Sequence, residues 1–91
     1  MNEKQKEALL ILQEECAEVI QAISKIFRFG FDSKWPENGA DNRERLTEEV
    51  GDLLAMIKLL SDFDVIDLSN LENLADKKLT KLKKWSNIFK E

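Results

Sequence analysis

Two short acidic stretches place carboxylates where a helix otherwise carries apolar side chains. They are EECAE at positions 14–18 and EEVGD at positions 48–52. Each holds two carboxylates three positions apart, which puts both on one face of a helix. A buried carboxylate without a partner is costly, and it tends either to take up a proton or to bind a cation. The two stretches together could therefore form a cation site.

The direction of each carboxylate in the first stretch follows from a helical wheel, at about 100° per residue. Glu15 lies between apolar residues, and Glu18 lies at the edge of the apolar face. Glu14 points further outward. The centre of that apolar face is expected near Leu12, Cys16 and Ile23.

The second stretch gives the clearer pattern. Glu49 falls inside an apolar face that contains Leu53, Met56 and Leu60, and Asp52 lies beside it. Glu48 points away and is expected to be solvated. Each stretch thus places an acidic pair toward a face that should be buried.

The ligand types favour a hard divalent cation. The chain has no histidine and one cysteine, which excludes a Cys/His zinc site and disfavours a di-iron site built on Glu-x-x-His. Carboxylates alone suit Mg²⁺, or Mn²⁺. The alternative is that lysines or arginines of a neighbouring helix pair with them. The protein would then be a non-enzymatic helical oligomerisation or interaction module held by interhelical salt bridges.

The elements that position these residues are helices. Apolar periodicity predicts a helix over 3–29 and a second from about Asn42, with Asp41-Asn42-Arg43-Glu44 as a capping box. The glycines and the single proline predict a loop over 30–41. A third helix is predicted from a second capping box, Ser69-Asn70-Leu71-Glu72, to Trp85 or Phe89. No segment alternates long enough to indicate a strand.

The predicted architecture is an all-α, antiparallel helical bundle formed by one domain over residues 1–91. Three wide apolar faces in so short a chain indicate a homo-oligomer, a dimer or a dimer of dimers. The net charge of −4 argues against nucleic-acid binding. The apolar runs are too short for a membrane span, and the lone cysteine suits a reducing compartment, so a cytoplasmic protein is expected.

The order of these acidic residues resembles a known signature. Glu14-Glu15-x-x-Glu18 followed by Glu49-x-x-Asp52 is similar to the EExxE…ExxD pattern of the MazG-like, all-α nucleoside triphosphate pyrophosphohydrolases. The resemblance covers about residues 7–63. Glu18 and Glu49 are separated by 30 residues, which is long for the family. The extra length falls in the loop and affects substrate choice more than chemistry.

The resemblance implies an activity and roles for the acidic residues. The activity is Mg²⁺-dependent hydrolysis of an NTP or dNTP to the monophosphate and pyrophosphate. Glu15, Glu18, Glu49 and Asp52 would hold the metal. Glu14 adjoins this cluster and could orient or deprotonate the attacking water, so Glu14 and Glu15 are the candidate catalytic carboxylates. Relatives that act on dUTP or on phosphoribosyl-ATP are further options for the substrate.

Four other residues are candidates for contacting the substrate, each with a structural alternative. Lys25 and Arg28 could contact phosphates or be solvated at the end of the first helix. Trp35 could stack on a base or pack against its own domain. Lys78 could reach a phosphate or extend along apolar surface to water.

Two small residues lie within the acidic stretches. Cys16 is expected to be a core residue, because no histidine is present to activate it. Gly51 costs about 1 kcal/mol of helix propensity relative to alanine. It would either allow a close approach by another helix or a phosphate, or be a plain packing residue.

Overall fold

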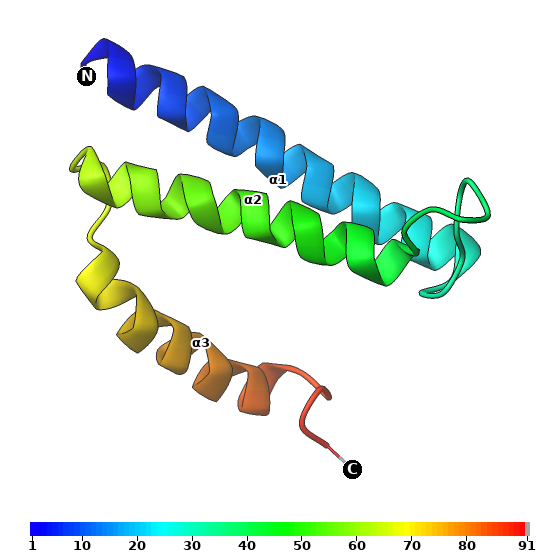
Figure 1. Ribbon diagram of the computed structural model, residues 1–91. Helices are drawn as coiled ribbons and strands as arrows, with labels where there is room; N and C mark the ends of the chain where they lie inside the picture. Colours follow the sequence, from blue (N-terminus) through cyan, green and yellow to red (C-terminus); the bar gives the residue numbers. More distant parts are fainter. Residues whose placement is uncertain (91) are drawn as a thin grey trace.

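The computed structural model describes residues 1–90, and it is all-helical (Figure 1). Its elements are α1 (Glu3–Phe29), α2 (Asn42–Asp62), a 3-10 turn η1 (Leu68–Asn70) and α3 (Leu71–Trp85). Within residues 1–90 the only β-type pairing is an isolated antiparallel bridge between Lys34 and Asp41. The prediction of an all-α fold is confirmed.

The bounds of α1 agree with the sequence prediction, and local capping explains them. The Asn2 side chain accepts a hydrogen bond from the Gln5 backbone N–H at 2.8 Å, and the Gln5 side chain accepts one from the Asn2 N–H at 3.0 Å. This reciprocal pair is a capping box. The helix ends at Gly30, whose φ of 89° suits a residue without a side chain.

The two predicted capping boxes have different outcomes. Asp41 is the N-cap of α2 as expected, because its side chain accepts a hydrogen bond from the Glu44 N–H at 2.8 Å, but this is only one half of the predicted box, since the Glu44 side chain does not bond back to the Asp41 N–H. The box predicted at 69–72 is wrong, since α3 has no side-chain cap. Asp67 instead accepts a hydrogen bond from the Ser69 N–H at 3.1 Å. This local bond forms a 3-10 turn and delays the start of α3 to Leu71.

An antiparallel hairpin of α1 and α2 holds the core (Figure 1). Ala8, Met56 and Leu60 are buried, and partly buried apolar residues, including Leu12 and Phe63, pack around them. Ala22 is also buried further along α1. The buried residues Ala8 and Ala22 and the half-buried Glu15 between them thus follow a seven-residue spacing, which keeps one face of α1 toward a neighbouring helix.

This face of α1 differs from the apolar centre that was predicted near Leu12, Cys16 and Ile23. Ile23 is 40% exposed, and Cys16 is exposed, so the prediction that Cys16 is a core residue is wrong. The two residues lie on the flank of the helix together with Ile20 and Phe27, because α2 packs on the neighbouring row.

The third helix stands apart from the hairpin. Within residues 1–90, α3 contacts η1 but packs against neither α1 nor α2 (Figure 1). None of its residues is buried. The expected bundle is therefore represented within one chain by the hairpin alone. Over the same residues, no helix has the length and apolarity needed to cross a membrane.

Candidate functional site

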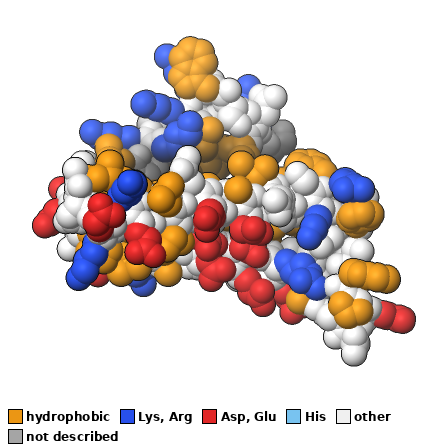
Figure 2. Space-filling model, turned by 90° about the horizontal axis from the view of Figure 1, so that it is seen from above, with side chains coloured by type: hydrophobic (Ala, Val, Ile, Leu, Met, Phe, Trp, Pro, Cys, Tyr) orange, Lys and Arg blue, Asp and Glu red, His pale blue; other side chains and the backbone are white. Residues whose placement is uncertain are grey.

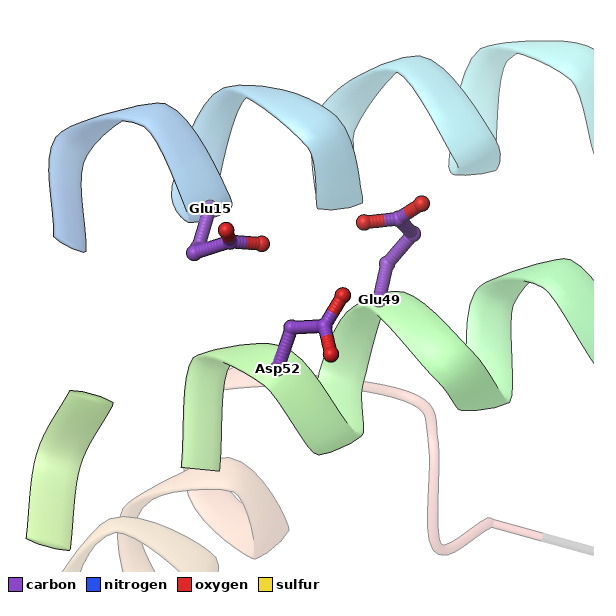
Figure 3. Close-up of side chains that lie close together, drawn as sticks. All are labelled: Glu15, Glu49 and Asp52. Atoms are coloured by element: carbon purple, nitrogen blue, oxygen red, sulfur yellow. The ribbon is translucent and has the colours of Figure 1, made fainter. Parts of the chain in front are cut away.

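Three carboxylates converge between the two helices of the hairpin. Glu15 projects from α1, and Glu49 and Asp52 project from adjacent turns of α2 (Figure 3). One oxygen from each lies within 4.8 Å of the others. Glu15 and Glu49 are half-buried, whereas Asp52 is exposed.

The same packing that builds the core builds this cluster. Glu15 follows the buried Ala8 by seven residues, and Glu49 precedes the buried Met56 by seven. Seven residues are two helical turns, so both carboxylates lie in the row that faces the opposite helix. In this part of the hairpin, carboxylates therefore occupy positions of the helix–helix contact that apolar side chains occupy elsewhere.

No basic side chain neutralises the cluster. Among residues 1–90 the only ion pair is between Arg43 and Asp32, at 3.7 Å and on the surface. The pKa of Glu15 is raised above its usual value, first by desolvation between the helices and then by the negative charges of Asp52 and Glu49. The expectation that interhelical salt bridges explain these acids is not supported within the chain.

The donor set fits a magnesium ion. Mg²⁺ is bound by oxygen atoms at 2.0–2.1 Å, so two ligands on opposite sides of the ion are about 4.2 Å apart. The oxygens of Glu15, Glu49 and Asp52 already lie within 4.8 Å of one another. A divalent cation would also remove the repulsion that raises the pKa of Glu15. The cluster thus has both the geometry and the excess charge that a hard cation requires.

The other two acids of the first motif lie outside this set of three. Glu18, one turn after Glu15, is exposed and lines a small cavity of about 80 Å³ beside Glu49. Glu14 is exposed and does not line this cavity. Both are near enough for their charge to raise the pKa of Glu15.

Two cavities adjoin one another at the loop end of the hairpin. The small one beside the cluster is lined by Glu18, Gln21, Ala22, Lys25, Asn42, Arg45, Glu48 and Glu49. A larger one of about 440 Å³ is lined by Lys25, Phe29, Ser33, Lys34, Trp35, Asn42 and Arg45. In Figure 2, acidic side chains gather along the middle of the face, and basic and hydrophobic ones gather toward the loop end. The two cavities share Lys25, Asn42 and Arg45, so the acidic and the basic regions are contiguous.

The four predicted substrate residues have different locations. Lys25 lines both cavities, and Trp35 lines the larger one. Trp35 is 85% exposed, so the alternative that it packs against its own domain is wrong. Arg28 lies over the Phe29 ring at 4.9 Å and lines neither cavity. Lys78 is exposed on α3, away from the hairpin.

Sequence reasoning missed two residues that line both cavities. Asn42 is 8% exposed, and its side-chain amide donates a hydrogen bond to the Gly30 carbonyl at 2.9 Å. The Arg45 guanidinium donates one to the Trp35 carbonyl at 2.6 Å. One signal was available for Arg45, which precedes Glu49 by four residues and so shares its face of α2. Nothing local in the sequence marks Asn42 as a link to α1.

Comparison with known proteins identifies a family. The sequence model for the MazG nucleotide pyrophosphohydrolase domain matches residues 3–86. No curated protein and no solved structure matches the chain. The matched range includes both acidic motifs, the loop between them and all of α3.

Proposed function

Because the chain belongs to the MazG nucleotide pyrophosphohydrolase family, we propose that it hydrolyses a nucleoside or deoxynucleoside triphosphate. The products are the monophosphate and pyrophosphate, and the reaction depends on Mg²⁺, with Mn²⁺ as a substitute. The observation that carries the proposal is the cluster of Glu15, Glu49 and Asp52, which has no basic partner and adjoins a cavity lined by basic residues.

In this proposal Glu15, Glu49 and Asp52 hold the metal, and Glu18 completes the acidic site beside Glu49. Mg²⁺ bound there would neutralise phosphate oxygens and make the attacking water more acidic. The water oxygen bonds to the α-phosphorus as the bond to the bridging α,β oxygen breaks. The proton of the water passes to a carboxylate, which is Glu14, the neighbour of Glu15 in the chain, or Glu18, which lines the cavity.

Basic residues stabilise the leaving group. Lys25 lines both cavities, and Arg45 does so from the first turns of α2. Both side chains only donate hydrogen bonds, and arginine can contact two phosphate oxygens at once. We propose that Lys25 and Arg45 contact the departing pyrophosphate. In the chain described here, Arg28 and Lys78 could take part only after a rearrangement or from another subunit.

The experiment that tests the proposal asks which bond is cut. Attack at the α-phosphorus should be blocked by an α,β-methylene triphosphate. It should proceed with a β,γ-methylene triphosphate, which would yield the monophosphate and methylenediphosphonate. The measurement is product identification by phosphorus NMR with each dNTP analogue and Mg²⁺. Orthophosphate as the first product, with the opposite pattern of blocking, would exclude a pyrophosphohydrolase even if the metal site is real.

A further inference from the structure

The larger cavity at the loop end of the hairpin is preformed. The Trp35 carbonyl accepts a hydrogen bond from Arg45 at 2.6 Å, and the Ser33 carbonyl accepts one from the Asn42 backbone N–H at 3.1 Å. The buried Asn42 side chain ties this wall to the end of α1 through the Gly30 carbonyl. These bonds fix the loop on the helices. The volume of about 440 Å³ lies in the range of small-molecule sites.

The aromatic lining indicates a flat ligand. Phe29 and Trp35 both line the cavity, and they are 57% and 85% exposed. The Arg28 guanidinium lies over one face of the Phe29 ring, at 4.9 Å from its centroid, so Trp35 is the more open of the two rings. Base stacking on such an exposed aromatic side chain is a common binding mode. A triphosphate alone gains little from such walls, because its charged oxygens stay solvated. The cavity is therefore suited to a nucleobase.

The ionisable residues that line the larger cavity are all basic. Lys25, Lys34 and Arg45 are its ionisable residues, and no carboxylate lines it. Lys25 and Arg45 also line the small acidic cavity, where the phosphates are proposed to lie, whereas Lys34 lines only the larger one. The backbone of Lys34 is held by its bridge to Asp41. Lys34 is therefore the cation available to the ring edge of a base.

Resting on the function proposed above, we infer that this cavity takes the nucleobase and that Lys34 selects bases with a carbonyl acceptor on the ring edge. A lysine ammonium donates three hydrogen bonds and accepts none. It can contact O6 and N7 of guanine or O4 of uracil and thymine. It is repelled by the amino groups of adenine and cytosine, which are donors at the same place. The preferred substrates are therefore dGTP, dUTP and dTTP over dATP and dCTP, or their ribonucleotide counterparts.

The test measures kcat/KM for each of these triphosphates with Mg²⁺, and binding of their α,β-methylene analogues by calorimetry. We expect the keto bases to be favoured by about tenfold, the size of one good base contact. Lys34→Gln should remove the preference. Lys34→Glu, which replaces a donor with an acceptor, should shift it toward dATP and dCTP. Lys77→Glu makes the same charge change on the exposed face of α3 and should leave the preference unchanged.

The outcomes separate this inference from the function on which it rests. If no triphosphate releases pyrophosphate, the proposed function fails and the inference fails with it. If triphosphates are hydrolysed without a keto preference, or if Lys34→Glu keeps the wild-type ranking, only the inference is overturned. Because Lys34 is exposed, both variants should fold, which circular dichroism can verify. The analogues give the ranking in binding without relying on turnover.

Discussion

Glu49 illustrates how a single residue can be placed by packing and used for chemistry. It lies seven residues before the buried Met56, in the row of α2 that faces α1. An apolar side chain there would extend the core by two turns. The sequence instead has a carboxylate opposite Glu15 (Figure 3). On the proposed function, such an arrangement should lower the stability of the metal-free protein and favour the binding of a cation.

Glu49→Gln should separate these two effects. Without Mg²⁺ the variant should melt at a higher temperature than wild type, because one of the repelling charges is gone. With Mg²⁺ it should lose the stabilisation that a ligand of the native state gives, about 2.7 kcal/mol at 100 times its Kd. Activity should fall by more than the 10–100-fold that is typical when a residue hydrogen-bonded to a metal ligand is replaced. Thermal melts with and without Mg²⁺ and a pyrophosphate assay measure the three effects.

The matched control is Glu3→Gln, which removes one carboxylate in the first turn of α1, three turns before Glu15. It should leave both the Mg²⁺ response and the turnover unchanged. Wild-type turnover by Glu49→Gln would show that the metal ligands are wrongly assigned.

The raised pKa of Glu15 predicts a pH dependence of stability. Its cause is desolvation first, then the charges of Asp52 and Glu49. The folded state therefore holds a proton on Glu15 at a pH where the unfolded chain has lost it. By linkage, stability without metal should fall as pH rises through the window just above the usual glutamate pKa, about 4.3. Mg²⁺ competes with that proton, so its stabilising effect should grow over the same window.

Thermal melts from pH 4 to pH 7, with and without Mg²⁺, test this expectation about Glu15. In Glu15→Gln without metal, the melting temperature should depend less steeply on pH over this window. A metal-free stability that rises across the window in wild type, relative to Glu15→Gln, would contradict the stated sign.

At the scale of elements, the hairpin is joined by a loop that is tied to both helices. Asn42 donates to the Gly30 carbonyl, and Arg45 donates to the Trp35 carbonyl. Within the loop, the Gly39 N–H donates to the Pro36 carbonyl at 2.7 Å, and a Cβ at Gly39 would lie only 3.0 Å from that oxygen. A side chain at Gly39 would therefore crowd the Pro36 carbonyl, and the turn favours glycine at this position.

Gly51 in α2, unlike Gly39, is expected to tolerate a side chain. It lies between Glu49 and Asp52, is exposed, and has no atom within 4 Å of the position of an added Cβ. The expectation of a close approach by another helix at Gly51 therefore finds no support within one chain. Gly51→Ala should stabilise the protein by up to about 1 kcal/mol through helix propensity. The measurement is the free energy of unfolding in urea.

The result for Gly51→Ala also informs on assembly. A clear loss of stability, most of all if the protein also dissociates, would contradict the prediction. It would show that a neighbouring subunit or a ligand needs the space beside the glycine.

At the scale of the whole molecule, a single chain is less compact than a globular monomer of the same size. Its extents are 43 × 36 × 15 Å, and the smallest is little more than one helix diameter of about 10–12 Å. Its accessible surface is 7580 Å², whereas a monomer of this mass would expose about 5,500 Å². Its radius of gyration is 16.2 Å, against about 12 Å for a compact domain of this length. A single layer of helices leaves apolar faces uncovered.

We therefore expect a homo-oligomer, a dimer or a dimer of dimers, as the sequence suggested. Exposed apolar side chains lie on all three helices; among them are Ile20, Phe27, Leu54, Leu79 and Trp85. Ile20→Glu, at a side chain that is 64% exposed, should weaken assembly because it buries a charge in the interface. Sedimentation velocity at micromolar concentration measures both proteins.

The control for Ile20→Glu is Gln13→Glu, which adds the same charge at an exposed polar position of α1. It should sediment like wild type. A wild-type protein that sediments as a compact monomer of 10.6 kDa would contradict the expected assembly.

The sequence by itself determined the helices and the order of the acidic residues, because these depend on local periodicity and capping. It predicted the bounds of α1 at Glu3 and Phe29 and the start of α2 after its cap at Asp41. It also identified all three residues of the carboxylate cluster. Helical spacing alone shows that such residues share a face.

Only the tertiary structure decided which rows of the two helices meet. The wheel of α1 has a wide apolar face, and α2 packs on the row of Ala8 and Ala22, leaving Cys16 and Ile23 on the flank. That choice places Glu15 against Glu49 and Asp52 and leaves Glu18 outside the set. The cavities lined by Arg45 and Asn42 likewise depend on hydrogen bonds between segments far apart in the chain, which no local pattern encodes.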